Sequence, residues 1–158
     1  MSQAQPFMTS GAELPQPLNV LGERITVLVD SGHSGGIELF RQQGDEGQGP
    51  PPHAHPWDET FYIVAGEVDI GAGDACRRLG PGAVAHVPAG VTHWFRFVTD
   101  GEMISVTSRE GASRLFTALD GAIKAGAQDK QALIPVILAH GAVLRDPPGG
   151  ARSASVEI

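Results

Sequence analysis

The chain has 158 residues, which is enough for one domain with a buried core. Apolar residues make up 41% of it and charged residues 18%, proportions that are typical of a globular protein and exclude a disordered one. The net charge of −7 argues against nucleic acid or an anionic membrane as the main partner.

Residues 1–22 are rich in Gln and Pro and have little hydrophobic periodicity. We expect them to form an N-terminal arm that lies across the domain or pairs with another subunit. Residues 23–110 carry short segments in which apolar and polar residues alternate, as they do in half-buried strands. Strands are predicted at 24–30, 37–42, 60–65, 67–70, 75–79, 84–87, 92–98 and 103–108. Turn residues recur between them, which is the pattern of an all-β barrel or sandwich.

The pattern changes after Gly111, where Leu115, Leu119 and Ile123 recur at helical spacing. A second helix is predicted to begin after Asp129 as its N-cap, to end before residue 141 and to be kinked by a proline at 135. Residues 111–145 are therefore expected to form a helical appendix, and residues 146–158 a tail.

A histidine pair gives the strongest chemical signal in the chain. His53 and His55 lie two residues apart, so an extended backbone points both imidazoles to one side. A bend at Pro56 can bring Glu59 to the same point, and His93 is a candidate for the fourth position. Imidazole and carboxylate are ligands of first-row metals, whereas a closed structural zinc site more often uses Cys.

Two segments resemble the two motifs of the cupin superfamily. The first contains Gly47, five residues, His53, one residue, His55, three residues, Glu59, six residues and Gly66. The second contains Gly82, five residues, Pro88-Ala89-Gly90, two residues and His93. The resemblance implies a double-stranded β-helix (jelly-roll) barrel, here followed by two short helices. It also implies that one divalent transition metal (Fe, Ni, Mn, Co, Cu or Zn) is bound by His53, His55, Glu59 and His93.

The second motif departs from the family at Phe97, where Asn is common. Phe97 shares a strand face with His93 and Phe95, which predicts an apolar wall for the substrate pocket. Phe61 and Ile63 share the parity of Glu59 and are further candidates for that wall. Packing in the core is the more frequent role for such residues.

The segment from His53 to Gly66 and the segment Val87-Pro88-Ala89-Gly90 are similar to those of single-domain bacterial cupins of the quercetinase-like group, which are flavonol dioxygenases. The resemblance implies a metal-dependent oxidoreductase whose metal binds the enolic hydroxyl of a small aromatic substrate while O2 opens the ring. Glu59 would then be a catalytic base as well as a ligand. That Glu59 serves only as a ligand stays an equal alternative.

Two other functions remain open. One is a non-catalytic module that binds a small molecule or a metal. The other is a sugar isomerase or a decarboxylase, which ranks lower because such pockets usually use Lys or Arg, and Arg96 lies on the opposite face from His93. Cupins are often dimers, so a homodimer is expected.

The single cysteine, Cys76, excludes an internal disulfide. No apolar stretch approaches the roughly 20 residues of a membrane helix, and the N-terminus lacks the basic and apolar regions of a signal peptide. We therefore expect a cytoplasmic protein whose main partner is a small-molecule substrate.

Overall fold

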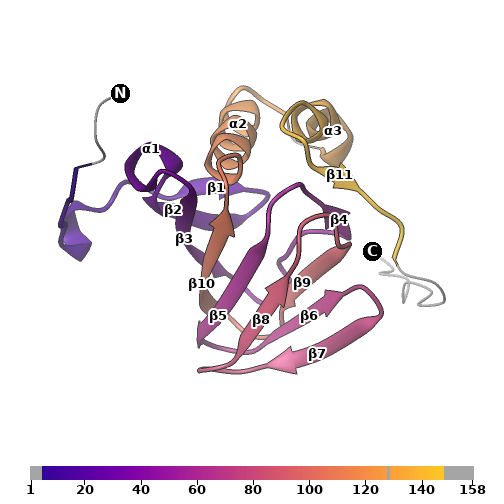
Figure 1. Cartoon of the computed structure of the whole chain (residues 1–158). Coiled ribbons are helices and arrows are strands. Elements are labelled where there is room, and N and C mark those ends of the chain that lie inside the picture. The colour runs from indigo at the N-terminus through magenta and orange to yellow at the C-terminus, as the bar shows by residue number, and fades with distance from the viewer. Residues whose placement is uncertain (1–4, 128, 148–158) are drawn as a thin grey trace.

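A computed structural model describes residues 5–127 and 129–147, and it shows two antiparallel β-sheets with two helices over one end (Figure 1). One sheet holds, in spatial order, β1 (Leu18–Val20), β2 (Glu23–Val29), β3 (Ile37–Gly44), β10 (Gly101–Ser108), β5 (Glu59–Ala65) and β8 (Val84–Val87). The other holds β11 (Val143–Leu144), β4 (His53–Ala54), β9 (His93–Phe97), β6 (Val68–Ala72) and β7 (Ala75–Leu79). The predicted all-β jelly-roll barrel is confirmed.

Strand β5 illustrates how the sequence pattern gives each sheet an inner and an outer face. Glu59, Phe61 and Ile63 are buried. Tyr62 and Val64, which alternate with them, are 48% and 41% exposed. This is the period of two that the alternation predicted. The same parity sends Glu59, the first residue of the strand, toward the barrel interior.

Two apolar clusters stabilise the molecule. The barrel cluster lies between the sheets and consists of Phe61, Ile63, Val68, Ile70, Val87, Phe95, Phe97 and Met103. The helix cluster joins the helices to the six-stranded sheet and consists of Ile25, Phe40, Trp57, Ala112, Leu115, Leu119, Leu133 and Ala142. Burial of these side chains removes apolar surface from water, which is the main stabilising contribution to folding.

Helices α2 (Ala112–Lys124) and α3 (Lys130–Ala139) cover one end of the barrel (Figure 1). Leu115 and Leu119 are buried on one face of α2, as the helical spacing predicted. Asp129 caps α3 by accepting a hydrogen bond from the N–H of Ala132. Pro135 lies inside α3, which continues through it to Ala139.

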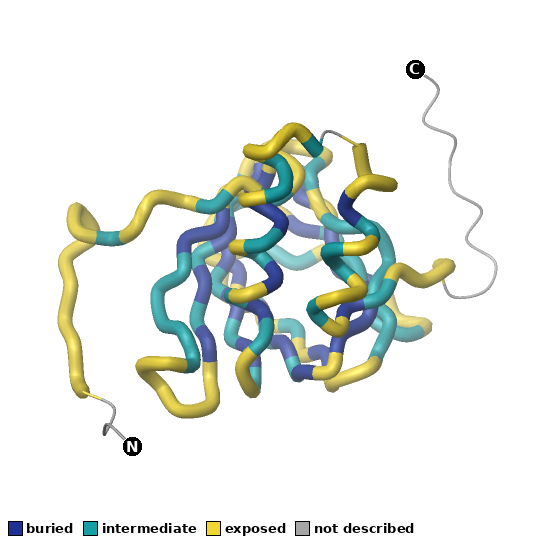
Figure 2. Tube along the Cα trace, turned by 90° about the horizontal axis from the view of Figure 1, so that it is seen from above, coloured by how far each residue is buried: buried dark blue, intermediate teal, exposed yellow. Residues whose placement is uncertain are grey.

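The predicted N-terminal arm is only partly separate from the barrel. Residues 18–20 form β1, which pairs with β2 at the edge of the larger sheet. Residues 5–17, which include the short 3-10 helix Gly11–Glu13, run outside the barrel and are almost all exposed (Figure 2). Residues 1–4, and residues 148–158 of the predicted tail, lie outside the described part of the chain.

Besides β1 and the 3-10 helix, three further short elements were not predicted. A four-residue helix, α1 (Ser31–Ser34), lies between two of the predicted strands. The chain at His53 and Ala54 forms β4, and β11 pairs with it beyond the helices. No helix in the described ranges is both long and apolar enough to cross a membrane.

Candidate metal centre

Strands β4 and β9 bring three histidines together from two distant parts of the chain. His53 in β4 is the register partner of His93 in β9, and His55 follows β4 directly. The ring centroids lie 4.2 Å apart for His53 and His93, 4.6 Å for His55 and His93, and 5.6 Å for His53 and His55. Ligand nitrogens of all three lie within 4.8 Å of one another. The structure thus brings together the three histidines that the motifs selected.

A hydrogen bond to the backbone orients each imidazole. The Nδ1 atoms of His53, His55 and His93 lie 2.8, 2.9 and 2.9 Å from the carbonyl oxygens of Pro51, Trp57 and Val91. Because a carbonyl oxygen can only accept, Nδ1 carries a hydrogen in each ring. In the neutral ring this leaves a lone pair on Nε2, which is the arrangement found in histidines that bind metals.

Glu59 reaches the same point from the other sheet. Its Oε2 lies 3.0 Å from Nε2 of His55 and 3.5 Å from Nε2 of His93. Burial would raise the pKa of Glu59, but the imidazoles of His55 and His93 outweigh burial and lower the pKa to about 2. The side chain is therefore a buried carboxylate that accepts a hydrogen bond from Nε2 of His55 in the metal-free protein, and a bound metal would take the place of that proton.

These four residues fit a divalent transition metal. His93 Nε2 is buried and has no hydrogen-bond partner in the described residues, so a lone pair is left free. Burial, and then the neighbouring His93, lowers the pKa of His53 to about 4, which keeps the ring neutral at pH 7. Two ligand atoms about 2.1 Å from one ion lie roughly 3.0–3.4 Å apart at bond angles of 90–109°. The 3.0 Å contact of Glu59 with His55 matches this separation, and the 3.5 Å contact with His93 is slightly longer.

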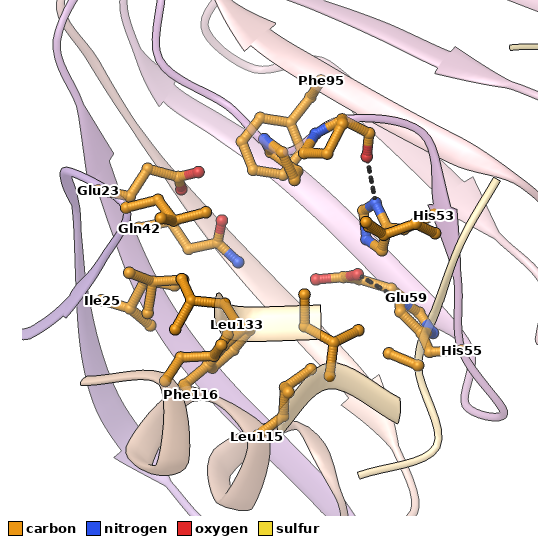
Figure 3. A pocket seen from close by; sticks show the side chains of 18 of the residues that line it. Glu23, Ile25, Gln42, His53, His55, Glu59, Phe95, Leu115, Phe116 and Leu133 are labelled. Atoms are coloured by element: carbon orange, nitrogen blue, oxygen red, sulfur yellow. Dashed lines mark hydrogen bonds and ion pairs between the residues drawn. The ribbon is translucent and has the colours of Figure 1, made fainter. Parts of the chain in front are cut away.

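A cavity of about 120 Å³ lies beside three of the four residues, His53, His55 and Glu59 (Figure 3). His53, His55 and Glu59 lie on one side of it, and Glu23 and Gln42 lie on the opposite side (Figure 3). The rest of the wall is mainly apolar and includes Ile25, Phe95, Leu115, Phe116, Leu119, Leu133 and Ile137. Helices α2 and α3 supply most of these apolar side chains, so the helical appendix closes the site.

Only one of the four residues predicted for the substrate wall lines this cavity. Phe95 lines the cavity, but Phe61, Ile63 and Phe97 are not among its lining residues and are fully buried in the barrel cluster. Strand parity placed all four on the inner face correctly. Parity does not give the position of a residue along the barrel. Phe61, Ile63 and Phe97 lie further along their strands, where side chains fill the barrel.

Two polar residues of the cavity were missed by the sequence interpretation. Glu23 is the first residue of β2 and Gln42 lies in β3, and they are 5% and 2% exposed. Glu23 has the parity of the buried Ile25, and Gln42 has that of the buried Phe40. A polar residue at an inward-facing strand position was the available signal.

The other histidines of the chain lie away from this centre. His86, which could have oriented a ligand, is exposed and its Nδ1 lies 2.8 Å from Oγ1 of Thr60. His33 contacts Asp30 in an exposed pair. His140 caps α3, where its Nδ1 lies 2.8 Å from the carbonyl oxygen of Val136.

Comparison with known proteins gives a match in the part of the chain that holds the site. Residues 40–109 match the family model described as Cupin domain, and this stretch contains all four predicted ligands. An uncharacterized protein of Streptomyces coelicolor is 37% identical over 49 residues, which cover 31% of this chain and 45% of that protein. The chain therefore spans less than half the length of the curated relative that it matches.

Solved structures share the fold. An RmlC-like cupin from Shewanella frigidimarina has a TM-score of 0.62 at 20% identity, covering 71% of this chain and 98% of that chain. A predicted oxalate decarboxylase from Thermotoga maritima has a TM-score of 0.56 at 19% identity, covering 65% and 99%. The DMSP lyase DddQ from Ruegeria pomeroyi has a TM-score of 0.53 at 28% identity, covering 65% and 59%. Together with the family match, these structures support the cupin superfamily.

Proposed function

We propose that this chain, whose barrel has the cupin fold, is a metal-dependent dioxygenase that acts on a small aromatic or enolic molecule. The proposal rests on one observation. Three oriented imidazoles and one buried carboxylate converge beside a mainly apolar cavity. His53, His55, Glu59 and His93 would hold the metal. Structural neighbours named as a lyase and a polyketide cyclase support an enzymatic role for this fold.

The chain's own residues have three tasks in such a reaction. A divalent transition metal bound here would supply a Lewis acid for a substrate hydroxyl and, if redox-active, electrons for O2 chemistry. Glu59 lies beside the cavity, where its carboxylate can take the proton of that hydroxyl. The apolar side chains of α2 and α3 exclude water from the reacting groups. Both atoms of O2 enter the substrate, which is itself the reductant, so no further reductant is required.

The charge of the cavity makes an acidic substrate a poorer fit. A substrate carboxylate would lie between Glu23 and Glu59, and the one lysine among the described lining residues, Lys130, is exposed. Decarboxylation, the reaction in the name of the Thermotoga neighbour, therefore ranks below oxidation of an uncharged enol.

The test combines metal content with O2 consumption. We expect purified protein to hold about one transition metal per chain, measured by elemental analysis. Metal-loaded protein should consume O2 with 3-hydroxy-4-pyranone or with its 2-methyl derivative as the substrate, measured with an oxygen electrode. Glu59→Gln should lower the rate by at least about a hundredfold, because a general base contributes 10²–10⁴-fold.

His86→Gln is the matched control, since His86 is an exposed histidine away from the metal centre. It should leave both the metal content and the rate unchanged. Full metal loading without O2 consumption across this panel would contradict the proposed reaction. A melting shift with the same compounds and no product would then favour the non-catalytic binding module.

A further inference from the structure

Glu23 is a buried carboxyl group with an unsatisfied oxygen. Its side chain lines the cavity, the residue is 5% exposed, and its Oε2 has no hydrogen-bond partner among the described residues. A buried polar group that is left without a partner destabilises the fold, so a ligand group that bonds to it would be favoured. The metal chemistry does not use Glu23, because it lies on the opposite side of the cavity from the histidines (Figure 3).

Gln42 lies beside Glu23 on that opposite side of the cavity (Figure 3). Its Nε2 donates a hydrogen bond of 2.8 Å to Oγ of Ser105, which is fully buried. A side chain that is anchored in this way loses little additional freedom when a ligand binds. Glu23 and Gln42 together thus form a fixed polar patch in a wall that is otherwise apolar; we call it the polar anchor.

The volume of the cavity limits the size of the ligand. The cavity measures about 120 Å³. An apolar cavity of roughly 150 Å³ accepts benzene. The enclosed space therefore suits one six-membered ring with small substituents, and it is small for the three rings of a flavonol.

We infer that the polar anchor binds a second hydroxyl group of the substrate, and that the substrate is an uncharged single-ring molecule with hydroxyl groups directed at both sides of the cavity. One hydroxyl would face the histidines and Glu59, and the other would satisfy Oε2 of Glu23. This inference rests on the proposed function, because the first hydroxyl is the one that meets the metal.

A hydroxyl group fits Glu23 in either protonation state. Burial, and then the charge of Glu59, raises the pKa of Glu23 to about 8, so the group is mainly a neutral acid at pH 7. A neutral carboxyl can donate to a hydroxyl oxygen, and a carboxylate can accept from a hydroxyl hydrogen. A ligand carboxylate at this position would instead be repelled by an ionised Glu23 and would be stripped of water in an apolar wall.

Calorimetric titration with four small probes tests the inference. The probes are phenol, hydroquinone, resorcinol and 4-hydroxybenzoate, added to zinc-loaded protein because zinc does not oxidise diphenols. We expect the better of the two diphenols to bind about tenfold more tightly than phenol, the gain of one hydrogen bond to a buried group. 4-Hydroxybenzoate should bind at least tenfold more weakly than hydroquinone.

Variants of Glu23 separate its role from general packing. Glu23→Leu should reduce the diphenol-to-phenol ratio to about one. Glu23→Gln, which keeps hydrogen-bonding groups, should retain most of the ratio. Glu67→Gln, at an exposed glutamate, is the control and should retain all of it.

Elemental analysis of the same samples distinguishes the failure of the two proposals. If zinc does not bind, the proposed function fails, but the ratio measured on metal-free protein still reports on Glu23. A ratio that Glu23→Leu leaves unchanged would overturn the inference. It would also be overturned if neither diphenol binds the protein with or without zinc.

Discussion

At the scale of single residues, the backbone orients the histidines of the candidate metal centre more than other side chains do. Each of the three histidines places its Nδ1 within 2.9 Å of a carbonyl oxygen only two residues away. Such local bonds form whenever the strand forms, so the direction of each Nε2 is set before any metal arrives. This preorganisation lowers the cost of ordering the ligands when the metal binds.

His93 is the histidine whose loss is expected to be most harmful. It comes from a different segment from His53 and His55, and its buried Nε2 has no hydrogen-bond partner within the described part of the chain. His93→Gln should weaken metal binding by more than about a hundredfold, since even the loss of a partner that orients a ligand costs 10–100-fold. Titration of metal-free protein with zinc or nickel in a calorimeter gives the affinity.

The control for this variant is His86→Gln, which changes the same residue type on an exposed strand position. It should bind the metal as the unchanged protein does. Equal affinities for His93→Gln and His86→Gln would contradict the assignment of His93 as a ligand.

The convergence of these side chains could be predicted because their spacing is local and specific. His53, His55 and Glu59 fall within seven residues, and the second motif supplied His93. Glu23 could not be predicted in the same way. It lies 30 residues before His53 in a separate strand, and only the folded barrel brings it to the cavity.

At the scale of elements, the loop between β3 and β4 positions the centre. Two backbone hydrogen bonds of 2.8 Å join this loop to β9. The Gly47 N–H donates to the Phe97 carbonyl, and the Phe97 N–H donates to the Gln48 carbonyl. The same loop then supplies the carbonyl of Pro51, which orients His53. A displaced loop would therefore disturb the site as well as the barrel.

Gly49 is the position in this loop where a side chain is least tolerated. Its φ is 152°, and a Cβ there would lie 2.0 Å from the carbonyl oxygen of Phe95. Because that oxygen belongs to a paired strand, it cannot move away. Gly49→Ala should destabilise the protein by about 2–4 kcal/mol and weaken metal binding, measured by urea unfolding and by metal titration.

Gly80→Ala is the matched control, since nothing lies within 4 Å of a Cβ at that glycine. It should change the free energy of unfolding by less than about 0.5 kcal/mol. If both alanine variants unfold at the same urea concentration, the close approach of the loop to β9 does not stabilise the structure.

Elements with a strong pattern could be predicted from the sequence, and very short ones could not. The strands at 75–79 and 84–87 have the predicted ends, and Asp129 caps α3 as expected. β4 and β11 have two residues each, too few to show alternation. Their pairing depends on the return of the chain after α3, which is a property of the tertiary structure.

At the scale of the whole molecule, the site lies where the two apolar clusters meet. Phe95 of the barrel cluster and Trp57, Leu115 and Leu133 of the helix cluster all line the cavity. Trp57 also stacks on His55 at 4.5 Å between ring centroids. The helices therefore stabilise the barrel and enclose the ligand with the same side chains, so the stability of the fold and the shape of the cavity are coupled.

Buried titratable groups in this cavity should make the stability of the metal-free protein depend on pH. The folded pKa of His53 is about 4, below the ordinary value near 6.5. Between about pH 4 and pH 6.5 the unfolded chain binds a proton at His53 and the folded protein does not. The free energy of unfolding therefore rises with pH in this interval. The folded pKa of Glu23 is about 8 and its ordinary value is 4.5, so it lowers stability as the pH rises from 4.5 to 8. The two effects oppose each other below pH 6.5.

Between pH 6.5 and 8 the effect of Glu23 is no longer opposed by that of His53. The unfolded chain has lost the proton of Glu23 in this interval while the folded protein keeps it, so each step toward higher pH favours unfolding. The free energy of unfolding of the metal-free protein should fall by roughly 1–2 kcal/mol over this interval. Urea unfolding at pH 6.5, 7.25 and 8 measures it. Glu23→Gln should abolish the fall and Glu67→Gln should retain it; the same fall in Glu23→Gln would show that Glu23 is not the group responsible.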